Sequence, residues 1–233
     1  KDGVNTTTGP IWGFTTKPYT IVNDNFESHP LGDLSAATLP WATYTKIDPG
    51  YSYISVNQGY GGSKGLTFVD SDDTGHSKIS RDISALKKGT VRFYLRADTN
   101  GSIGFRDNVS WVPYVCLGDM GSGYGMYSWN GSTGVFTKIM SVTSNTWYDI
   151  YIYFDFNAGQ NYFRVYVDDV LRRTEYLSGT FSVTNFTFLT FTDAVCNWAD
   201  IDNVVVTALQ PGYSTAGEAG FEEFSGSTDS STR

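Results

Sequence analysis

The sequence is poor in several residue types, and each shortage excludes a class of protein. It has only two cysteines, Cys116 and Cys196, and no Cys-x-x-Cys pair. This excludes a zinc site built on paired thiolates and a thioredoxin-like redox motif. Two cysteines are enough for one disulfide, but cysteine is also a common buried residue with a free thiol, so both alternatives stay open.

Long apolar runs and an excess of basic residues are also lacking. The longest runs, such as residues 150–154, fall far short of the roughly 20 apolar residues that cross a bilayer, so we expect no insertion into a membrane. Lys and Arg number 16 against 24 Asp and Glu, which gives a net charge of −8. This charge repels phosphate backbones and argues against nucleic acid as a partner.

Helical periodicity is nearly absent, and strand-like alternation is present throughout. Val91, Phe93 and Leu95 alternate with polar residues, and residues 147–154 and 162–167 follow the same rule. Turn residues such as Asn, Asp, Gly and Pro recur about every ten residues. The pattern predicts an all-β fold, an antiparallel two-sheet β-sandwich of the jelly-roll type.

The composition changes at both ends of the chain. Residues 1–18 and 210–233 show little alternation and are rich in Gly, Ser and Thr, so we expect two extensions around a single domain at 19–209. Such extensions are candidate contacts to a neighbouring domain or subunit. Abundant Gly, Ser and Thr with five Asn-x-Ser/Thr triplets favour a secreted or extracellular protein.

Several segments resemble a known group of domains in their order along the chain. They are Asp24-Asn25-Phe26-Glu27, Gly62-Ser63-Lys64-Gly65-Leu66, Val91-Arg92-Phe93-Tyr94, Thr146-Trp147-Tyr148-Asp149, Val167-Asp168-Asp169-Val170 and Ile201-Asp202-Asn203-Val204. The chain resembles the concanavalin A-like, laminin-G-like jelly rolls of secreted proteins that bind or degrade polysaccharides. The resemblance implies two packed sheets with sugar recognition on a concave face or a loop edge, and leaves catalysis open.

The resemblance also implies a structural calcium ion. In similar jelly rolls the first and last strands lie side by side and supply oxygen ligands, and Asp24, Glu27 and Asp202 match those positions. Carboxylates that cap turns would give the same pattern. The acidic run that starts at Asp70 is not an EF-hand loop, because Arg81 stands where a bidentate Glu is required.

One strand face is a candidate binding surface. With Val91, Phe93 and Leu95 in the core, Arg92, Tyr94 and Arg96 must point away from it together, and two guanidinium groups suit the carboxylate or sulfate of an anionic sugar. The resemblance places this strand in the concave sheet, with Arg106 on a neighbouring strand. The competing interpretation is that these arginines pair with the surplus carboxylates.

An aromatic and glycine-rich stretch is the second candidate surface. Its rings can stack on the C–H faces of sugars, and its glycines allow close approach. The aromatic residues are Trp111, Tyr114, Tyr124, Tyr127 and Trp129. Packing in the core or at a sheet edge accounts for the same residues equally well.

Catalytic motifs are sparse. There is no Glu-x-Asp-x-x-Glu of jelly-roll glycosidases and no Gly-x-Ser-x-Gly elbow. A lyase that acts by β-elimination remains an alternative, in which Arg92, Arg96 and Arg106 hold the uronate carboxylate while Tyr94 or His76 transfers the proton. The His, Tyr and Lys of the jelly-roll alginate lyases are missing from the comparable segments.

The sequence therefore supports three hypotheses. The first is a secreted carbohydrate-binding domain whose partner is a polysaccharide, neutral or anionic. The second is a polysaccharide lyase that cleaves an anionic, uronate-containing polymer. The third is a cell-surface or filament subunit whose terminal extensions add a strand to a neighbour.

Overall fold

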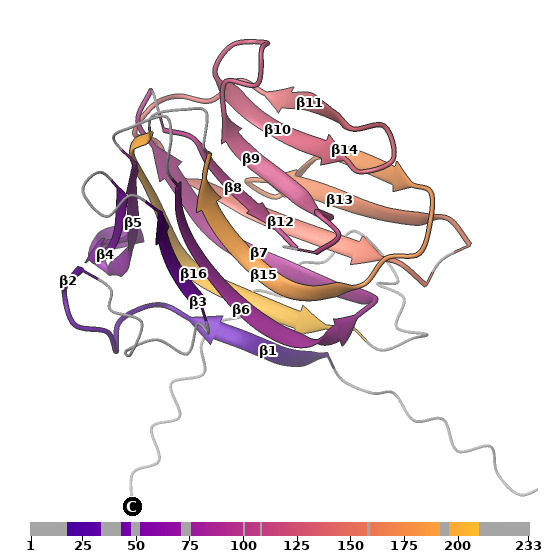
Figure 1. Cartoon of the computed structure of the whole chain (residues 1–233), viewed down its shortest axis with the longest axis horizontal. Coiled ribbons are helices and arrows are strands. Elements are labelled where there is room, and N and C mark those ends of the chain that lie inside the picture. Colours follow the sequence, from indigo (N-terminus) through magenta and orange to yellow (C-terminus); the bar gives the residue numbers. More distant parts are fainter. Residues whose placement is uncertain are drawn as a thin grey trace, which may run out of the picture.

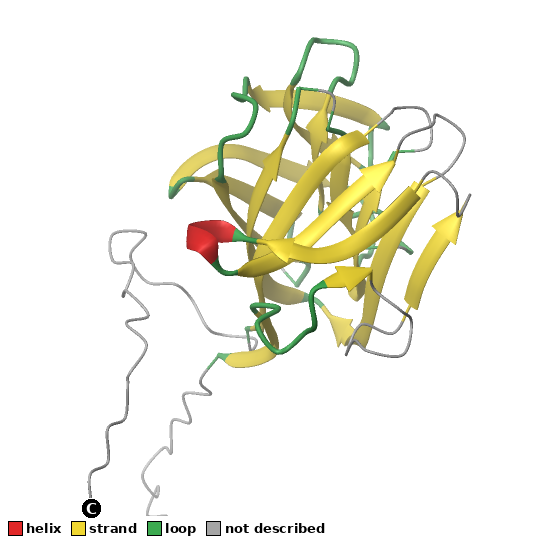
Figure 2. Cartoon of the chain, turned by 90° about the vertical axis from the view of Figure 1, so that its left-hand side faces the viewer, coloured by secondary structure: helices red, strands yellow, loops and turns green. Residues whose placement is uncertain are grey.

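Alternating strands build two antiparallel sheets that pack face to face, as the sequence predicts (Figure 1). The structure is a computed structural model that describes residues 18–33, 43–47, 52–70, 76–99, 101–107, 109–157, 159–191 and 196–209. In these residues strands dominate, and the helical structure is one turn, η1 (Tyr60–Gly62), between β4 and β5 (Figure 2). No helix in the described part is long and apolar enough to cross a membrane.

The first sheet has nine strands and contains both the first and the last strand of the domain. In spatial order they are β14 (Val170–Leu177), β13 (Asn161–Val167), β12 (Tyr148–Asp155), β7 (Lys88–Ala97), β16 (Cys196–Ala208), β5 (Lys64–Asp70), β4 (Ser52–Gln58) and β2 (Gly32–Asp33). The ninth, β1 (Tyr19–Asp24), pairs with the second half of β16, whose first half pairs with β5. One long strand thus joins the beginning of the domain to its centre.

The second sheet has seven strands and lies in front of the first in Figure 1. In spatial order they are β11 (Val135–Met140), β10 (Gly125–Asn130), β9 (Tyr114–Gly118), β8 (Ile103–Arg106), β15 (Val183–Thr190), β6 (His76–Leu86) and β3 (Thr43–Ile47). Because side chains alternate along a strand, each sheet has one face in the core and one outer face.

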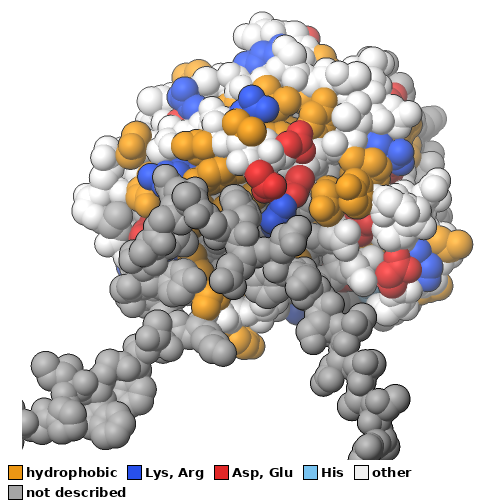
Figure 3. Space-filling model, turned by 180° about the vertical axis from the view of Figure 1, so that it is seen from behind, with side chains coloured by type: hydrophobic (Ala, Val, Ile, Leu, Met, Phe, Trp, Pro, Cys, Tyr) orange, Lys and Arg blue, Asp and Glu red, His pale blue; other side chains and the backbone are white. Residues whose placement is uncertain are grey.

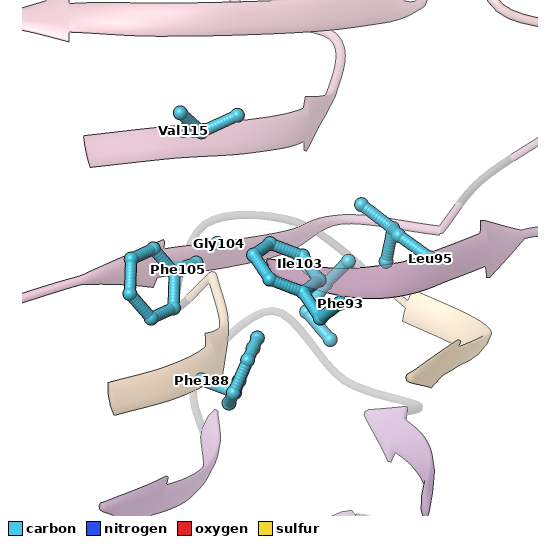
Figure 4. A pocket seen from close by; sticks show the side chains of 7 residues that line it. All are labelled: Phe93, Leu95, Ile103, Gly104, Phe105, Val115 and Phe188. Atoms are coloured by element: carbon cyan, nitrogen blue, oxygen red, sulfur yellow. The ribbon is translucent and has the colours of Figure 1, made fainter. Parts of the chain in front are cut away.

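The core lies between the inner faces and is rich in phenylalanine. The rings of Phe93, Phe105 and Phe188 pack with centroids 5.0–5.3 Å apart, which joins β7 of the first sheet to β8 and β15 of the second. A small apolar gap of about 10 Å³ lies at this place, and Figure 4 shows the side chains that line it. A gap of that size and polarity is a packing defect and no ligand site.

The two cysteines are not bonded to each other. Cys196 lies in the main core, whereas Cys116 lies in a separate cluster with Tyr114 and Tyr127 on the outer face of the second sheet. Burial raises the pKa of the Cys196 thiol to about 12 and raises the pKa of the Cys116 thiol even further. Both side chains are therefore neutral core residues at physiological pH. The extensions predicted at 1–18 and 210–233, except Pro18, lie outside the described residues.

Candidate functional site

The outer face of β7 carries the three side chains that the alternation predicts, but its two arginines are already paired. Arg92 donates to both carboxylate oxygens of Asp149, with 2.9 Å between Nε and Oδ1, and also reaches Asp169. Arg96 donates from Nε to Oδ2 of Asp200 over 3.0 Å. These ion pairs are the ones that the competing interpretation predicts, with carboxylates compensating both guanidinium groups.

Arg96 also lies against two indole rings. Its guanidinium carbon is 4.7 Å from the ring centroid of Trp147 and 5.2 Å from that of Trp198. Asp200 is fixed from the other side, because its Oδ1 accepts a hydrogen bond of 2.6 Å from the hydroxyl of Thr67. Contacts of an arginine with indole faces are favourable and hold all three side chains in place.

A hollow of about 360 Å³ opens at this cluster on the outer face of the first sheet. Its walls are polar and come from β4, β5, β7, β16 and the turn before β12. They are Asn57, Gln58, Thr67, Val69, Arg96, Asn145, Trp198 and Asp200. Figure 3 views the molecule from behind, the side of the first sheet, where acidic and basic side chains lie together among hydrophobic ones. A hollow of this volume is in the size range of small-molecule sites.

Tyrosine rings extend the aromatic surface next to the hollow. Tyr60, which is 42% exposed, stacks on Tyr94 with centroids 4.0 Å apart and planes at 4°. The edge of Tyr60 also meets Trp147, 5.9 Å away. Burial and the nearby Asp149 raise the pKa of Tyr94, so this phenol keeps its proton at neutral pH. Tyr94 is suited to packing and poorly suited to the role of a general base.

The prediction that Arg106 stands beside Arg92 and Arg96 is wrong. Arg106 ends β8 in the second sheet, so the core separates it from β7. It lies instead with the predicted aromatic residues: its guanidinium carbon is 4.1 Å from the ring centroid of Trp111 and 5.5 Å from that of Tyr114. Trp129 packs on the same cluster, 6.5 Å from Tyr114.

Two of the predicted sugar-binding rings have packing roles in the structure. Tyr127 is 1% exposed and donates its hydroxyl proton to the carbonyl of Gly123. Tyr124 packs against the main core and donates to the carbonyl of Asp98. The alternative of structural packing therefore holds for both. Alternation alone does not reveal it, because it separates the two faces of a strand without showing which face other segments cover.

The residues expected to act together in a lyase are divided between the two sheets. Arg92 and Arg96 are neutralised on the first sheet and Arg106 lies on the second. His76 is the first residue of β6, also in the second sheet, and its side chain lies outside the described residues.

The three carboxylates expected to bind calcium are divided between two places. Asp24 accepts from the backbone N–H of Phe26 and contacts His29. Asp202 accepts hydrogen bonds from Tyr60, Ser63 and Asn203, while Glu27 accepts one from the backbone N–H of Lys64. In the described part of the chain, no three His, Cys, Asp or Glu side chains are grouped as metal ligands.

Apart from Arg96, the side chains around the hollow are ones that sequence reasoning missed. Trp147, Trp198, Asn57 and Asn145 come from distant segments, and only the sheet order β4-β5-β16-β7-β12 brings them together. The sequence contains one signal for Trp147: this residue directly precedes the regular alternation that starts at Tyr148.

Comparison with solved structures identifies the class of fold as a concanavalin A-like jelly roll. A sialidase matches 81% of this chain with a TM-score of 0.63 and 16% identity, and the chain spans 18% of that protein. Domain 4 of AbnA, a GH43 extracellular arabinanase from Geobacillus stearothermophilus in complex with arabinotriose, matches 84% of the chain and 96% of its own length, with a TM-score of 0.52 and 13% identity. The GH131 β-glucanase catalytic domain from Podospora anserina matches 87% and 100%, with a TM-score of 0.54 and 15% identity.

At these identities the likeness establishes the fold alone. No protein-family model matches the chain, and no curated protein matches it in sequence.

Proposed function

We propose that this chain is a carbohydrate-binding domain that holds sugar units of a polysaccharide in the hollow beside Arg96. The observation that carries this proposal is an open hollow lined by Trp198 and planar polar side chains, with the indole of Trp147 packed on Arg96 beside it. Indole and phenol faces pack against the C–H faces of sugar rings, and Asn, Gln, Asp and Arg side chains hydrogen-bond to hydroxyl groups in pairs. This arrangement of rings and planar polar groups is suited to binding a sugar.

The electrostatics of this face favour a neutral sugar. The charge of Arg96 is compensated by Asp200, and that of Arg92 by Asp149 and Asp169. A carboxylate or sulfate brought to the hollow would meet these acidic groups without a free cation to receive it. Two similar folds belong to proteins named for neutral glycans, an arabinanase domain in complex with arabinotriose and a β-glucanase, which agrees with this choice.

A bound calcium ion fits the proposal at Glu27 and Asp202. Burial raises the pKa of Asp202, although Ser63, Asn203 and Tyr60 donate hydrogen bonds to it, and Glu27 raises it further. Two carboxylates that repel each other next to a hydroxyl group are the hard oxygen donors that calcium prefers. Asp24 faces His29 and is left out of this set. Such an ion, and an extracellular location where calcium is plentiful, would suit a domain that acts on polymers outside the cell.

The test is a binding titration with neutral oligosaccharides, including arabino- and β-gluco-oligosaccharides. We expect Trp147→Ala and Asn57→Ala each to weaken binding at least about tenfold, the effect of losing roughly 1.4 kcal/mol. Tyr176→Ala, which removes a 54% exposed ring from the same sheet outside the hollow, is the control and should bind normally.

In parallel, the protein is incubated with anionic, uronate-containing polymers, and the ultraviolet absorbance of the unsaturated uronates that a lyase would form is recorded. It should stay flat, and a rise would restore the lyase hypothesis. Equal affinity of Trp147→Ala and wild type for every neutral sugar that binds would contradict the site.

A further inference from the structure

Arg106 differs from the paired arginines of the first sheet because no acidic side chain neutralises it. In the described part of the chain it makes no ion pair and no hydrogen bond, and its Nε is buried without a partner. Its two terminal nitrogens are not among the buried unpartnered atoms, so they reach solvent. A half-buried guanidinium without an ion pair is unusual in a chain of net charge −8, because acidic partners are in excess.

The neighbouring acid, Asp107, is fully committed elsewhere. Its Oδ1 accepts from the backbone N–H groups of Thr184 and Asn185 at 2.9 and 3.0 Å. Its Oδ2 accepts from the backbone N–H groups of Val109 and Ser110 and from the Ser110 hydroxyl. This carboxylate therefore ties the loop after β8 to the start of β15, and it leaves Arg106 free.

The loop that Asp107 anchors presents Trp111 to solvent. Trp111 is 45% exposed and has a φ of 61°, a left-handed backbone conformation that a bulky residue rarely adopts. The backbone N–H of Trp111 donates a hydrogen bond to the backbone carbonyl of Asp107 over 3.1 Å. An exposed indole that is held in an unfavourable conformation above an unpaired cation is typical of a binding site.

A second ring, that of Tyr114, supports Arg106 from below and is itself only 2% exposed. Tyr114 lies across Gly104, where an added Cβ would come within 2.8 Å of its ring, so only glycine leaves space for it. No hydrogen bond joins the Tyr114 hydroxyl to another described residue, and burial raises its pKa, so it stays protonated as a donor. Arg106 and Trp111 thus offer a cation and a flat face side by side, and the buried ring of Tyr114 supports them from below.

We propose that Arg106 and Trp111, which pack on the buried ring of Tyr114, form a second binding site, on the face opposite the hollow, for a sugar unit that carries a carboxylate or a sulfate group. The terminal nitrogens of Arg106 would receive the anionic group and Trp111 would stack on the ring. The domain then has a neutral-sugar site on one sheet and an anionic-sugar site on the other. This site stands without the first one, since the core separates them.

The experiment is a titration at low salt with three probes of equal length: an oligogalacturonate, a sulfated galacto-oligosaccharide and a neutral galacto-oligosaccharide. We expect at least one anionic probe to bind, the neutral probe not to bind at this site, and Arg106→Gln to weaken anionic binding at least tenfold. Whether the carboxylated or the sulfated probe binds identifies the anionic group.

Arg172→Gln removes the same charge from an exposed position on β14 and is the matched control, which should bind like wild type. Arg106→Lys keeps the charge and should retain part of the affinity, which separates charge from folding defects. The proposal is overturned if neither anionic probe binds wild type, or if Arg106→Gln binds as tightly as Arg172→Gln. Trp147→Ala should leave anionic binding unchanged, so the two sites fail or succeed separately.

Discussion

At the scale of single residues, glycine is required where two segments touch near Asp202. A Cβ on Gly59 would lie 2.5 Å from Oδ2 of Asp202 and 2.6 Å from the carbonyl oxygen of Lys64. The Gly59 N–H also donates to the carbonyl of Ser63 over 2.7 Å, which closes the turn that carries Tyr60. The missing side chain therefore lets the turn approach β16 closely and places Tyr60 next to the hollow.

Gly59→Ala tests this close approach. Because backbone atoms on the other side cannot move aside, we expect the free energy of unfolding to fall by about 1–3 kcal/mol. Gly159→Ala is the matched control, since nothing lies within 4 Å of its added Cβ. The measurement is urea denaturation of both variants followed by tryptophan fluorescence. Equal free energies of unfolding for the two variants would contradict the requirement for glycine at position 59.

At the scale of elements, a buried carboxylate links β14, the edge strand of the first sheet, to β10, which lies next to the edge strand of the second. Glu175 on β14 of the first sheet is 1% exposed and accepts from Ser128 at 2.6 Å and from Asn130 at 3.0 Å, both on β10 of the second sheet. Arg173 donates to it over 2.8 Å. Burial alone would raise the pKa of Glu175, but these hydrogen bonds outweigh burial and the pKa is lowered.

The lowered pKa determines how this link depends on pH. A carboxylate with a lower pKa in the folded state stabilises that state fully above its unfolded pKa, and the stabilisation is lost as the pH falls through the folded pKa. We expect Glu175→Gln to lower the free energy of unfolding by about 1–3 kcal/mol at neutral pH and to lose less further stability on acidification than wild type. Urea denaturation at neutral and acidic pH measures both. If the free energy of unfolding depended on pH in the same way in the wild type and in Glu175→Gln, this role of Glu175 would be contradicted.

The elements were predictable from the sequence to a greater extent than the site. Alternation around Phe93, Ile150 and Val165 gives strands whose apolar side chains are all buried, because burying one face is what a half-exposed strand requires. The pairing of β7 with β16 and not with β8 depends on contacts distant in sequence, which periodicity does not encode. For that reason Arg106 was assigned to the wrong sheet.

At the scale of the whole molecule, the first and last strands lie together next to the segment that holds Glu27. Lys64, which starts β5, donates from its ammonium group to the carbonyl oxygens of Glu27 and His29, each over 2.9 Å. With Asp202 on β16 and β1 along the same strand, this region ties the entry of the chain to the centre of the first sheet. A calcium ion at Glu27 and Asp202 would strengthen that tie.

Calcium binding is expected to show as thermal stabilisation. A ligand that binds only the folded state at about 100 times its dissociation constant adds about 2.7 kcal/mol, which corresponds to roughly 5–10 °C in the melting temperature of a domain of this size. We expect calcium to raise the melting temperature over a chelator control, and Glu27→Gln to abolish the increase. Magnesium serves as the control ion. If calcium left the melting temperature of the wild type unchanged, the proposed calcium site at Glu27 and Asp202 would be contradicted.

The central claim, sugar binding in the hollow on the first sheet, is tested most directly by protein-observed NMR. The indole N–H signals of Trp147 and Trp198 and the side-chain amides of Asn57 and Asn145 report on the hollow, and the indole of Trp111 reports on the opposite face. Titration with a neutral oligosaccharide that binds should shift the first group and leave Trp111 in place. Shifts confined to Trp111, or binding that leaves Trp147 and Trp198 unmoved, would contradict the claim.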